Sequence, residues 1–105
     1  MLLLNAFSIN MLSTFPMDVR FERVSVEEVK EDVELTSAIG HMDTARVLST
    51  LLGREVPCNR ATVNLHDGSC VWVAQYIGAR LPEGATVLPD GARIEFFRVS
   101  VFAHN

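Results

Sequence analysis

The chain has 105 residues, a formal net charge of −4, and 49% hydrophobic against 21% charged residues. This length fits one domain, residues 1–105, and the composition excludes an intrinsically disordered protein. The two cysteines, Cys58 and Cys70, show no C-x-x-C spacing, so we expect packed thiols in a reducing compartment, not a zinc site or a disulfide.

The N-terminal part of the chain predicts two strands separated by a helical turn. Leu2–Phe7 is expected to be a buried strand; it is too short and lacks the basic residues of a signal peptide or a membrane span. Ser8–Phe15 predicts a short helical turn that Pro16 ends. Alternating residue types then predict a second strand over Met17–Val24.

Two helices are expected next. Ser25 with Glu28 three residues later is a capping-box pattern, and it predicts a helix from Val26 to about Val33. A central helix is predicted over Asp43–Leu52, and Gly53 follows at the position where helices often end. Its apolar residues fall on one stripe at helical spacing: Val47, Leu48, Leu51 and Leu52.

The C-terminal half predicts three strands and a loop. A third strand is expected from Pro57 to Leu65, followed by a hairpin turn at residues 66–68 and a strand over Ser69–Ile77. Gly78–Gly91 is rich in glycine and proline and predicts a loop. Ala92–Phe102 predicts a long interior strand. The expected fold is a small single-domain α/β protein, with a mixed sheet of about five strands and two or three helices.

The negative charge lies in one segment. Val26–Glu34 contains five acidic residues and Lys30, so the rest of the chain is neutral, with eight acidic residues and eight arginines. Arginine suits bidentate contact with phosphate, so a few arginines could hold a compact anionic ligand without the broad basic surface that duplex nucleic acid needs. We expect the others to be solvated: Arg20, Arg23, Arg54, Arg93 and Arg98.

His41 lies between Gly40 and the predicted central helix. The first turn of a helix has backbone N–H groups without intrahelical partners and attracts anions such as phosphate. A histidine at that point can present a proton to a bound phosphodiester. The alternative is that His41 only caps the helix or packs against Met42.

Three other segments carry candidate binding residues. Polar residues lie at or just beyond the end of the first predicted strand and could bind sugar hydroxyls or base edges, or could instead form a turn with helix capping: Asn5, Ser8 and Asn10. Arg60 opens the polar side of the third predicted strand and is either a ligand contact or an ordinary solvated arginine. The GARLPEG loop displays Arg80 and Glu83, which predict either a substrate clamp or a surface ion pair.

Four sequence blocks, in this order, cover much of the chain: LLNAFSINML, SAIGH followed by TA-x-x-L-x-x-L-L-G, P-x-NR, and RLPEG. Together they closely resemble the viral-type ring nucleases, the family of type III anti-CRISPR proteins that degrade cyclic tetra-adenylate. The resemblance implies that His41 is the catalytic acid and that Glu83 belongs to the site. It implies ligand contacts by Asn5, Ser8, Asn10, Arg60 and Arg80. It further implies a homodimer closed over one ligand, with no metal and no cofactor.

The chemistry of these residues agrees with that activity. In a ring of 3′–5′ linked nucleotides, each ribose 2′-OH can attack its neighbouring phosphate, and a histidine can protonate the leaving 5′-oxygen. Arg60 or Arg80 would stabilise charge on the phosphoryl oxygens, and Glu83 could orient a ribose hydroxyl or His41. The products would be linear adenylates with 2′,3′-cyclic phosphate ends.

Two other functions are compatible with these residues. A non-catalytic dimer could sequester a nucleotide messenger or dock on protein or DNA, with His41 as a helix cap. A metal hydrolase built from His41, His66, Asp67 and the cysteines has no supporting ligand spacing. We expect a cytoplasmic protein, in the host-cell cytoplasm if it is viral, with no membrane partner.

Overall fold

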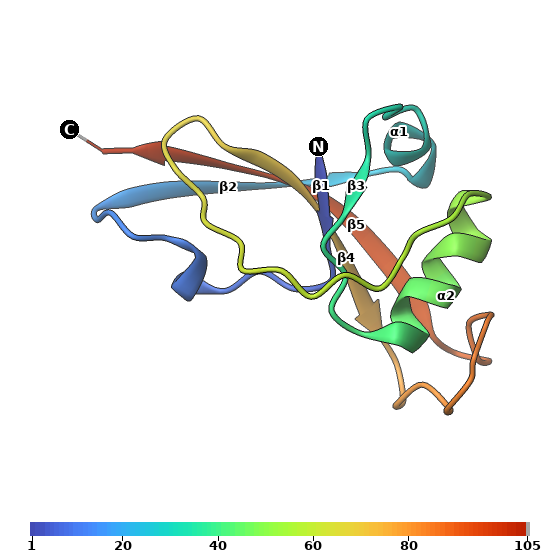
Figure 1. The fold of residues 1–105 in the computed structure, drawn as a ribbon. Helices are drawn as coiled ribbons and strands as arrows, with labels where there is room; N and C mark the ends of the chain where they lie inside the picture. The colour runs from blue at the N-terminus through green and yellow to red at the C-terminus, as the bar shows by residue number, and fades with distance from the viewer. Residues whose placement is uncertain (105) are drawn as a thin grey trace.

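Five strands form one mixed sheet in the order β2-β5-β4-β1-β3, with two α-helices beside it (Figure 1). The computed structural model describes residues 1–104. The strands are β1 (Leu2–Leu4), β2 (Met17–Val24), β3 (Thr36–Ser37), β4 (Cys70–Ile77) and β5 (Arg93–Ala103). The helices are α1 (Val26–Lys30), α2 (Met42–Leu52) and the short 3-10 helix η1 (Ile9–Met11). The predicted class, a small α/β domain with a mixed sheet, is confirmed.

The sheet is antiparallel on one side and parallel on the other. β5 pairs antiparallel with both β2 and β4 in unbroken registers that place Phe97 opposite Arg23 and Val73. β1 pairs parallel with β4 and with β3. The strand predicted over Met17–Val24 is confirmed at both ends, and the last strand lies inside the sheet as predicted.

Each face of the sheet has its own apolar core, because successive residues of a strand point to opposite faces. Trp72 of β4 belongs to the core on the helix side, together with Leu48 of α2. Val73 belongs to the core on the other side. Irregular segments close this second core and contribute Leu12 and Leu65 to it.

The strand predicted from Pro57 to Leu65 is wrong. The segment makes only isolated bridges, Cys58 with Ile39 and Leu65 with Leu12. Its alternating pattern arises because one side of the segment packs on the second core while the other side faces solvent, without a continuous strand beside it. The fifth strand is β3, whose two residues are too few to show any alternation.

The first predicted strand is shorter than expected. β1 ends at Leu4 instead of Phe7, and the Asn5 side chain turns so that its Oδ1 accepts a hydrogen bond from the Gly40 backbone nitrogen at 3.3 Å. The helical turn predicted within Ser8–Phe15 is confirmed as η1. The chain therefore leaves the sheet at Leu4 and passes through η1 before it enters β2.

The turn predicted at residues 66–68 forms, but it does not join two strands. The Ser69 nitrogen donates to the His66 carbonyl at 2.9 Å, and Gly68 has a φ of 87°. No strand lies between the end of α2 and this turn, so the turn leads from an irregular segment into β4. The hairpin prediction is wrong for the same reason as the third strand.

Both predicted α-helices form, and two of their four ends are as predicted, while α2 begins at Met42, one residue before the predicted Asp43. Ser25 caps α1 by accepting from the Glu28 nitrogen at 3.2 Å, and Gly53 ends α2 with a φ of 64°. α1 stops at Lys30 and does not reach Val33. Among residues 1–104, no helix has the length and apolar character required to cross a bilayer.

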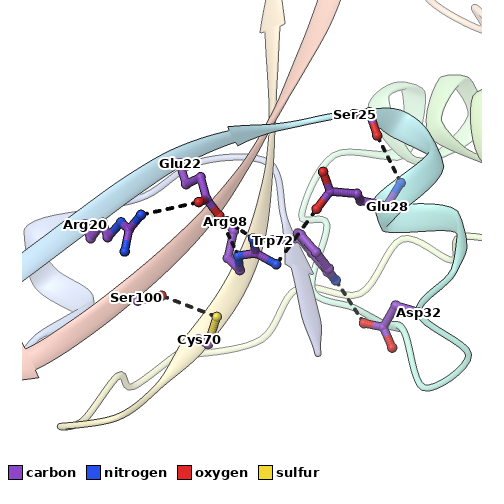
Figure 2. A network of polar contacts seen from close by, with 9 residues as sticks. All are labelled: Arg20, Glu22, Ser25, Glu28, Asp32, Cys70, Trp72, Arg98 and Ser100. Carbon is purple, nitrogen blue, oxygen red and sulfur yellow. Dashed lines mark hydrogen bonds and ion pairs between the residues drawn. The ribbon is translucent and has the colours of Figure 1, made fainter.

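Figure 2 shows a polar network around Trp72 on the helix side of the sheet. The indole Nε1 donates to the Asp32 carboxylate at 2.9 Å, and the Arg98 guanidinium lies 5.7 Å from the ring centroid while it pairs with Glu22. Arg98 is half-buried, and so is Arg54, which donates to the Asp32 carbonyl at 2.9 Å. The prediction that these two arginines are solvated is wrong. The other three are exposed as predicted: Arg20, Arg23 and Arg93.

The network favours the ionised forms of Asp32 and Glu22. Partial burial raises the pKa of Asp32, but hydrogen bonds from Trp72 and the Met1 amine outweigh that effect, so the pKa lies below its ordinary value. The hydrogen bond and charge of Arg98 lower the pKa of Glu22. This part of the molecule is therefore most stable with both acids charged.

Candidate functional site

A cleft with a volume of about 560 Å³ lies beyond the carboxyl ends of β1 and β4, at the start of α2. It brings together four of the seven predicted site residues from three separate regions of the chain. These four are Asn5, His41, Arg80 and Glu83. The cleft is completed by Asp43, Thr44, Tyr76, Gly78, Ala79 and Leu81.

A second cleft of about 400 Å³ adjoins the first and shares Asn5 with it. Arg60, the fifth predicted residue, lines this second cleft, and its Nε donates to the Gly40 carbonyl at 2.9 Å. The Gly40 nitrogen donates to Asn5 on the other side. A Cβ at Gly40 would lie 3.4 Å from the Arg60 Cγ, which is about van der Waals distance. The two clefts therefore meet at Asn5, and we refer to them together as the groove.

His41 is both the cap of α2 and a lining residue of the first cleft. Its Nδ1 accepts from the Thr44 backbone nitrogen at 3.4 Å, and the Thr44 hydroxyl lies at the same distance. His41 therefore caps the helix, as the alternative expects, and whether it does only this is a separate question. The cap does not exclude proton transfer, because Nε2 has no hydrogen-bond partner among residues 1–104 and, in the neutral ring, this is the nitrogen that carries the hydrogen.

The loop with Arg80 and Glu83 leaves β4 in a constrained conformation. The Tyr76 hydroxyl donates to the Ala79 carbonyl. Gly78 has a φ of 151°, and a Cβ there would lie 2.8 Å from the Ala92 Cβ, so only glycine fits without displacing the chain. Within residues 1–104, Arg80 and Glu83 form no ion pair with each other, and the predicted surface-pair alternative is wrong.

Ser8 and Asn10 lie outside both clefts. The Ser8 hydroxyl accepts from the Asn10 backbone nitrogen at 3.2 Å and caps η1. Both residues are exposed. The capping alternative for Ser8 is thus confirmed, and their predicted contact with a ligand requires a surface beyond the two clefts.

Sequence analysis missed three cleft residues. Asp43 and Thr44 lie two and three residues after His41 in the first turn of α2, and Tyr76 is the penultimate residue of β4, just before the loop. Their closeness in sequence to His41 and to the GARLPEG block is the signal that could have identified them. Asp43 adds a carboxylate to a cleft that was expected to bind phosphate.

The other candidate metal ligands are not gathered. Among residues 1–104, no group of three or more His, Cys, Asp or Glu side chains is arranged to hold a metal ion. Cys58 and Cys70 are half-buried free thiols, and Cys70 lies 3.5 Å from the Ser100 hydroxyl. His66 and Asp67 are exposed in the turn before β4. The metal-hydrolase alternative therefore gains no support from the structure.

Comparison with known proteins identifies the family. The family model described as STIV B116-like matches residues 1–93. The chain belongs to the STIV B116-like family. B116 of Sulfolobus turreted icosahedral virus has a similar structure, with a TM-score of 0.77 and 34% identity, covering 94% of this chain and 97% of B116.

Two viral relatives extend the comparison. This B116-like chain is 30% identical over 96 residues to protein 26 of Sulfolobus islandicus filamentous virus (isolate Iceland/Hveragerdi), covering 83% of this chain and 80% of that protein. It is 43% identical over 68 residues to the ORF117 protein of Acidianus two-tailed virus, covering 60% of this chain and 57% of that protein. The chain is thus similar to proteins of three viruses, in structure to one of them and in sequence to all three.

Proposed function

We propose that this protein is a metal-independent ring nuclease. It binds cyclic tetra-adenylate at a homodimer interface and cleaves it to linear adenylates with 2′,3′-cyclic phosphate ends, which switches off type III CRISPR signalling. The observation that carries the proposal is the first cleft, which gathers His41, Arg80 and Glu83 with Asn5 from distant parts of the chain. The sequence blocks that resemble the ring nucleases contain these same residues.

The substrate supplies the nucleophile in this reaction. The ribose 2′-oxygen attacks the adjacent phosphorus, its proton leaves to solvent, and the bond from phosphorus to the 5′-oxygen breaks. Holding the 2′-oxygen in line with the leaving group can lower the barrier by roughly 7 kcal/mol or more. The leaving 5′-oxygen takes a proton from Nε2 of protonated His41, which typically accelerates such a step about 10²- to 10⁴-fold. In the protonated ring Nδ1 also carries a hydrogen, so the capping bond from the Thr44 nitrogen is released in that state.

The groove offers cations and hydrogen-bond donors for the phosphates. Arg80 lines the first cleft and Arg60 the second, so the two charges flank Asn5. The Arg60 Nε is used by Gly40, which fixes the side chain and leaves its terminal nitrogens for a ligand. Glu83 is exposed in the same cleft and accepts hydrogen bonds from a ribose hydroxyl or from His41.

A homodimer follows from the symmetry of the substrate. A cyclic tetranucleotide can present two equivalent halves, and a two-fold dimer repeats one surface on both sides of its axis. One subunit then needs to provide half of a site, which suits two shallow clefts of about 560 and 400 Å³. The partner subunit would bring a second His41 to the other side of the ring.

A non-catalytic binding module is the second candidate. The bond between His41 Nδ1 and the Thr44 nitrogen supports it, because helix capping alone accounts for a histidine at this position. The arginines and Asn5 would then retain a cyclic nucleotide without cleaving it.

Incubation with cyclic adenylates of different ring sizes in the presence of EDTA, followed by chromatography, tests the proposal. We expect cyclic tetra-adenylate to be converted to linear products with 2′,3′-cyclic phosphate ends. Tight binding without products would favour the binding module. Loss of activity on adding EDTA would require a metal-dependent mechanism instead.

A further inference from the structure

The Asp43 carboxylate ties the active-site loop to the helix that carries His41. Asp43 lies in the first turn of α2, and its Oδ1 accepts from the Gly84 backbone nitrogen at 3.2 Å. The same Oδ1 accepts from the Arg46 guanidinium at 3.3 Å. The carboxylate is only 17% exposed, so it is a fixed part of the cleft wall.

The position of Gly84 gives this bond its importance. Gly84 directly follows Glu83, so the bond holds the far end of the segment from Arg80 to Glu83. The near end of the segment is held by Gly78, packed against Ala92. The five residues from Ala79 to Glu83 are thereby held at both ends, in the cleft that His41 also lines.

The helix dipole favours an acid in the first turn of α2, but a carboxylate at Asp43 must also be reconciled with an anionic ligand in the same cleft. An uncompensated carboxylate in a phosphate-binding groove would repel the ligand, at a cost that rises as the groove excludes water. Here Arg46 approaches the same oxygen that binds Gly84, so the charge is paired while the acceptor remains in use. A ligand contact is not required to account for Asp43.

We propose that Asp43 is a positioning residue, which holds the Arg80–Glu83 segment at a set distance from His41. Its catalytic consequence rests on the proposed nuclease function, whereas the tie to Gly84 can be measured independently of any activity. The same hydrogen bond would couple His41, the proposed proton donor, to the loop that carries Arg80, the proposed phosphate ligand. Both would then move with the first turn of α2.

Two substitutions at Asp43 test the proposal. Asp43→Asn keeps an oxygen that can accept from both Gly84 and Arg46, because both bonds end on Oδ1, and it removes only the charge. Asp43→Ala removes the acceptor. We expect Asp43→Ala to speed hydrogen exchange of the Gly84 amide, measured by NMR, and to lower kcat/KM for cyclic tetra-adenylate, each by about tenfold, the effect of one lost hydrogen bond. Asp43→Asn should remain close to wild type in both measurements.

Thr50→Val is the matched control. The Thr50 hydroxyl also joins α2 to this loop, through the Thr86 carbonyl at 2.7 Å, but it does so beyond the segment that carries Arg80 and Glu83. Its loss should leave Gly84 exchange and kcat/KM near wild type. An equal effect of Thr50→Val would overturn the specific role of Asp43.

Three results separate this proposal from the proposed function. Unchanged Gly84 exchange in Asp43→Ala overturns the tie, whatever the activity. If Asp43→Asn is as impaired as Asp43→Ala, the negative charge of Asp43 is what matters and its hydrogen bond from Gly84 is not. That result also overturns the proposal. If wild type cleaves no cyclic tetra-adenylate, the nuclease fails, and the Gly84 exchange rates still decide whether Asp43 holds the loop.

Discussion

The His41 Nδ1 atom lies 3.4 Å from the Thr44 backbone nitrogen, so one ring nitrogen closes the start of α2 while the other remains for the cleft. One imidazole thus provides the helix cap and, in the proposed mechanism, the proton. Replacing His41 by alanine would therefore affect helix stability and the proposed proton transfer together. A useful variant must keep the cap and remove only the acid.

His41→Asn meets that requirement, because asparagine is among the best N-cap residues but cannot act as a general acid at neutral pH. We expect His41→Asn to bind cyclic tetra-adenylate normally and to cleave it about 10²- to 10⁴-fold more slowly. His41→Ala should lose cleavage equally and also about 1 kcal/mol of stability in thermal unfolding. His66→Asn, in the exposed turn, is the control. Turnover by His41→Asn at the wild-type rate would remove His41 from the mechanism.

Arg60→Ala is expected to weaken binding of cyclic tetra-adenylate by about tenfold or more, the effect of one charge-assisted hydrogen bond. Binding is best measured by calorimetry in the non-cleaving His41→Asn background. The matched variant is Arg20→Ala, which removes the same charge from β2, where the side chain is 72% exposed and outside both clefts. Equal losses in the two variants would mean that only the overall charge matters.

Light scattering should report a dimer, and calorimetry should give one cyclic tetra-adenylate for every two chains. The reason is that neither cleft encloses a ring of four nucleotides, while a two-fold pair of grooves presents two sets of contacts. A stable monomer that binds one ligand per chain would contradict the shared site.

Asp32 makes stability depend on pH in a direction set by its lowered pKa. A carboxyl whose pKa is lower in the folded state contributes stability above its unfolded value of about 3.9, and that contribution is lost as the pH falls through the folded value. Asp32→Asn should therefore lower the free energy of unfolding near pH 7, on the order of 1 kcal/mol, and the difference from wild type should shrink in acid. Asp90→Asn, in the exposed loop, is the control for denaturant titrations at several pH values.

Gly78→Ala should displace the loop that carries Arg80. Its Cβ would lie 2.8 Å from the Ala92 Cβ, and the φ of 151° also disfavours a side chain. Gly91→Ala is a matched comparison, because Gly91 has a φ of 80° but open space around it. Gly78→Ala should cost about 1–3 kcal/mol more than Gly91→Ala in thermal unfolding, the usual cost of a steric overlap. Similar losses would show that the contact with Ala92 relaxes freely.

The features that sequence predicts well in this chain are decided by near neighbours. The Ser25 cap needs only Glu28, three residues away, and the end of α2 needs only a glycine that accepts positive φ. β2 shows its alternation over eight residues. Each of these signals lies within about eight consecutive residues, so the sequence alone is sufficient to predict the structure there.

The failures concern partners that lie far away. Residues 57–65 alternate like a strand, but whether they join the sheet depends on β3, which takes the edge beside β1. The hydrogen bond between Asp43 and Gly84 joins residues 41 positions apart, and no local sequence pattern predicts it. Arg98 becomes half-buried only because its register in β5 places it opposite Trp72. His41, Arg80 and Glu83 were grouped by family resemblance, since spacing alone does not bring them together.

Gly40 has one further consequence, for inhibitor design. Its nitrogen donates to Asn5 and its carbonyl accepts from Arg60, so the peptide units on both sides of Gly40 are hydrogen-bonded to side chains that line the clefts. A compound that displaces either side chain must break one of these hydrogen bonds. Inhibitor fragments should therefore be chosen to fit the backbone at Gly40 as it stands.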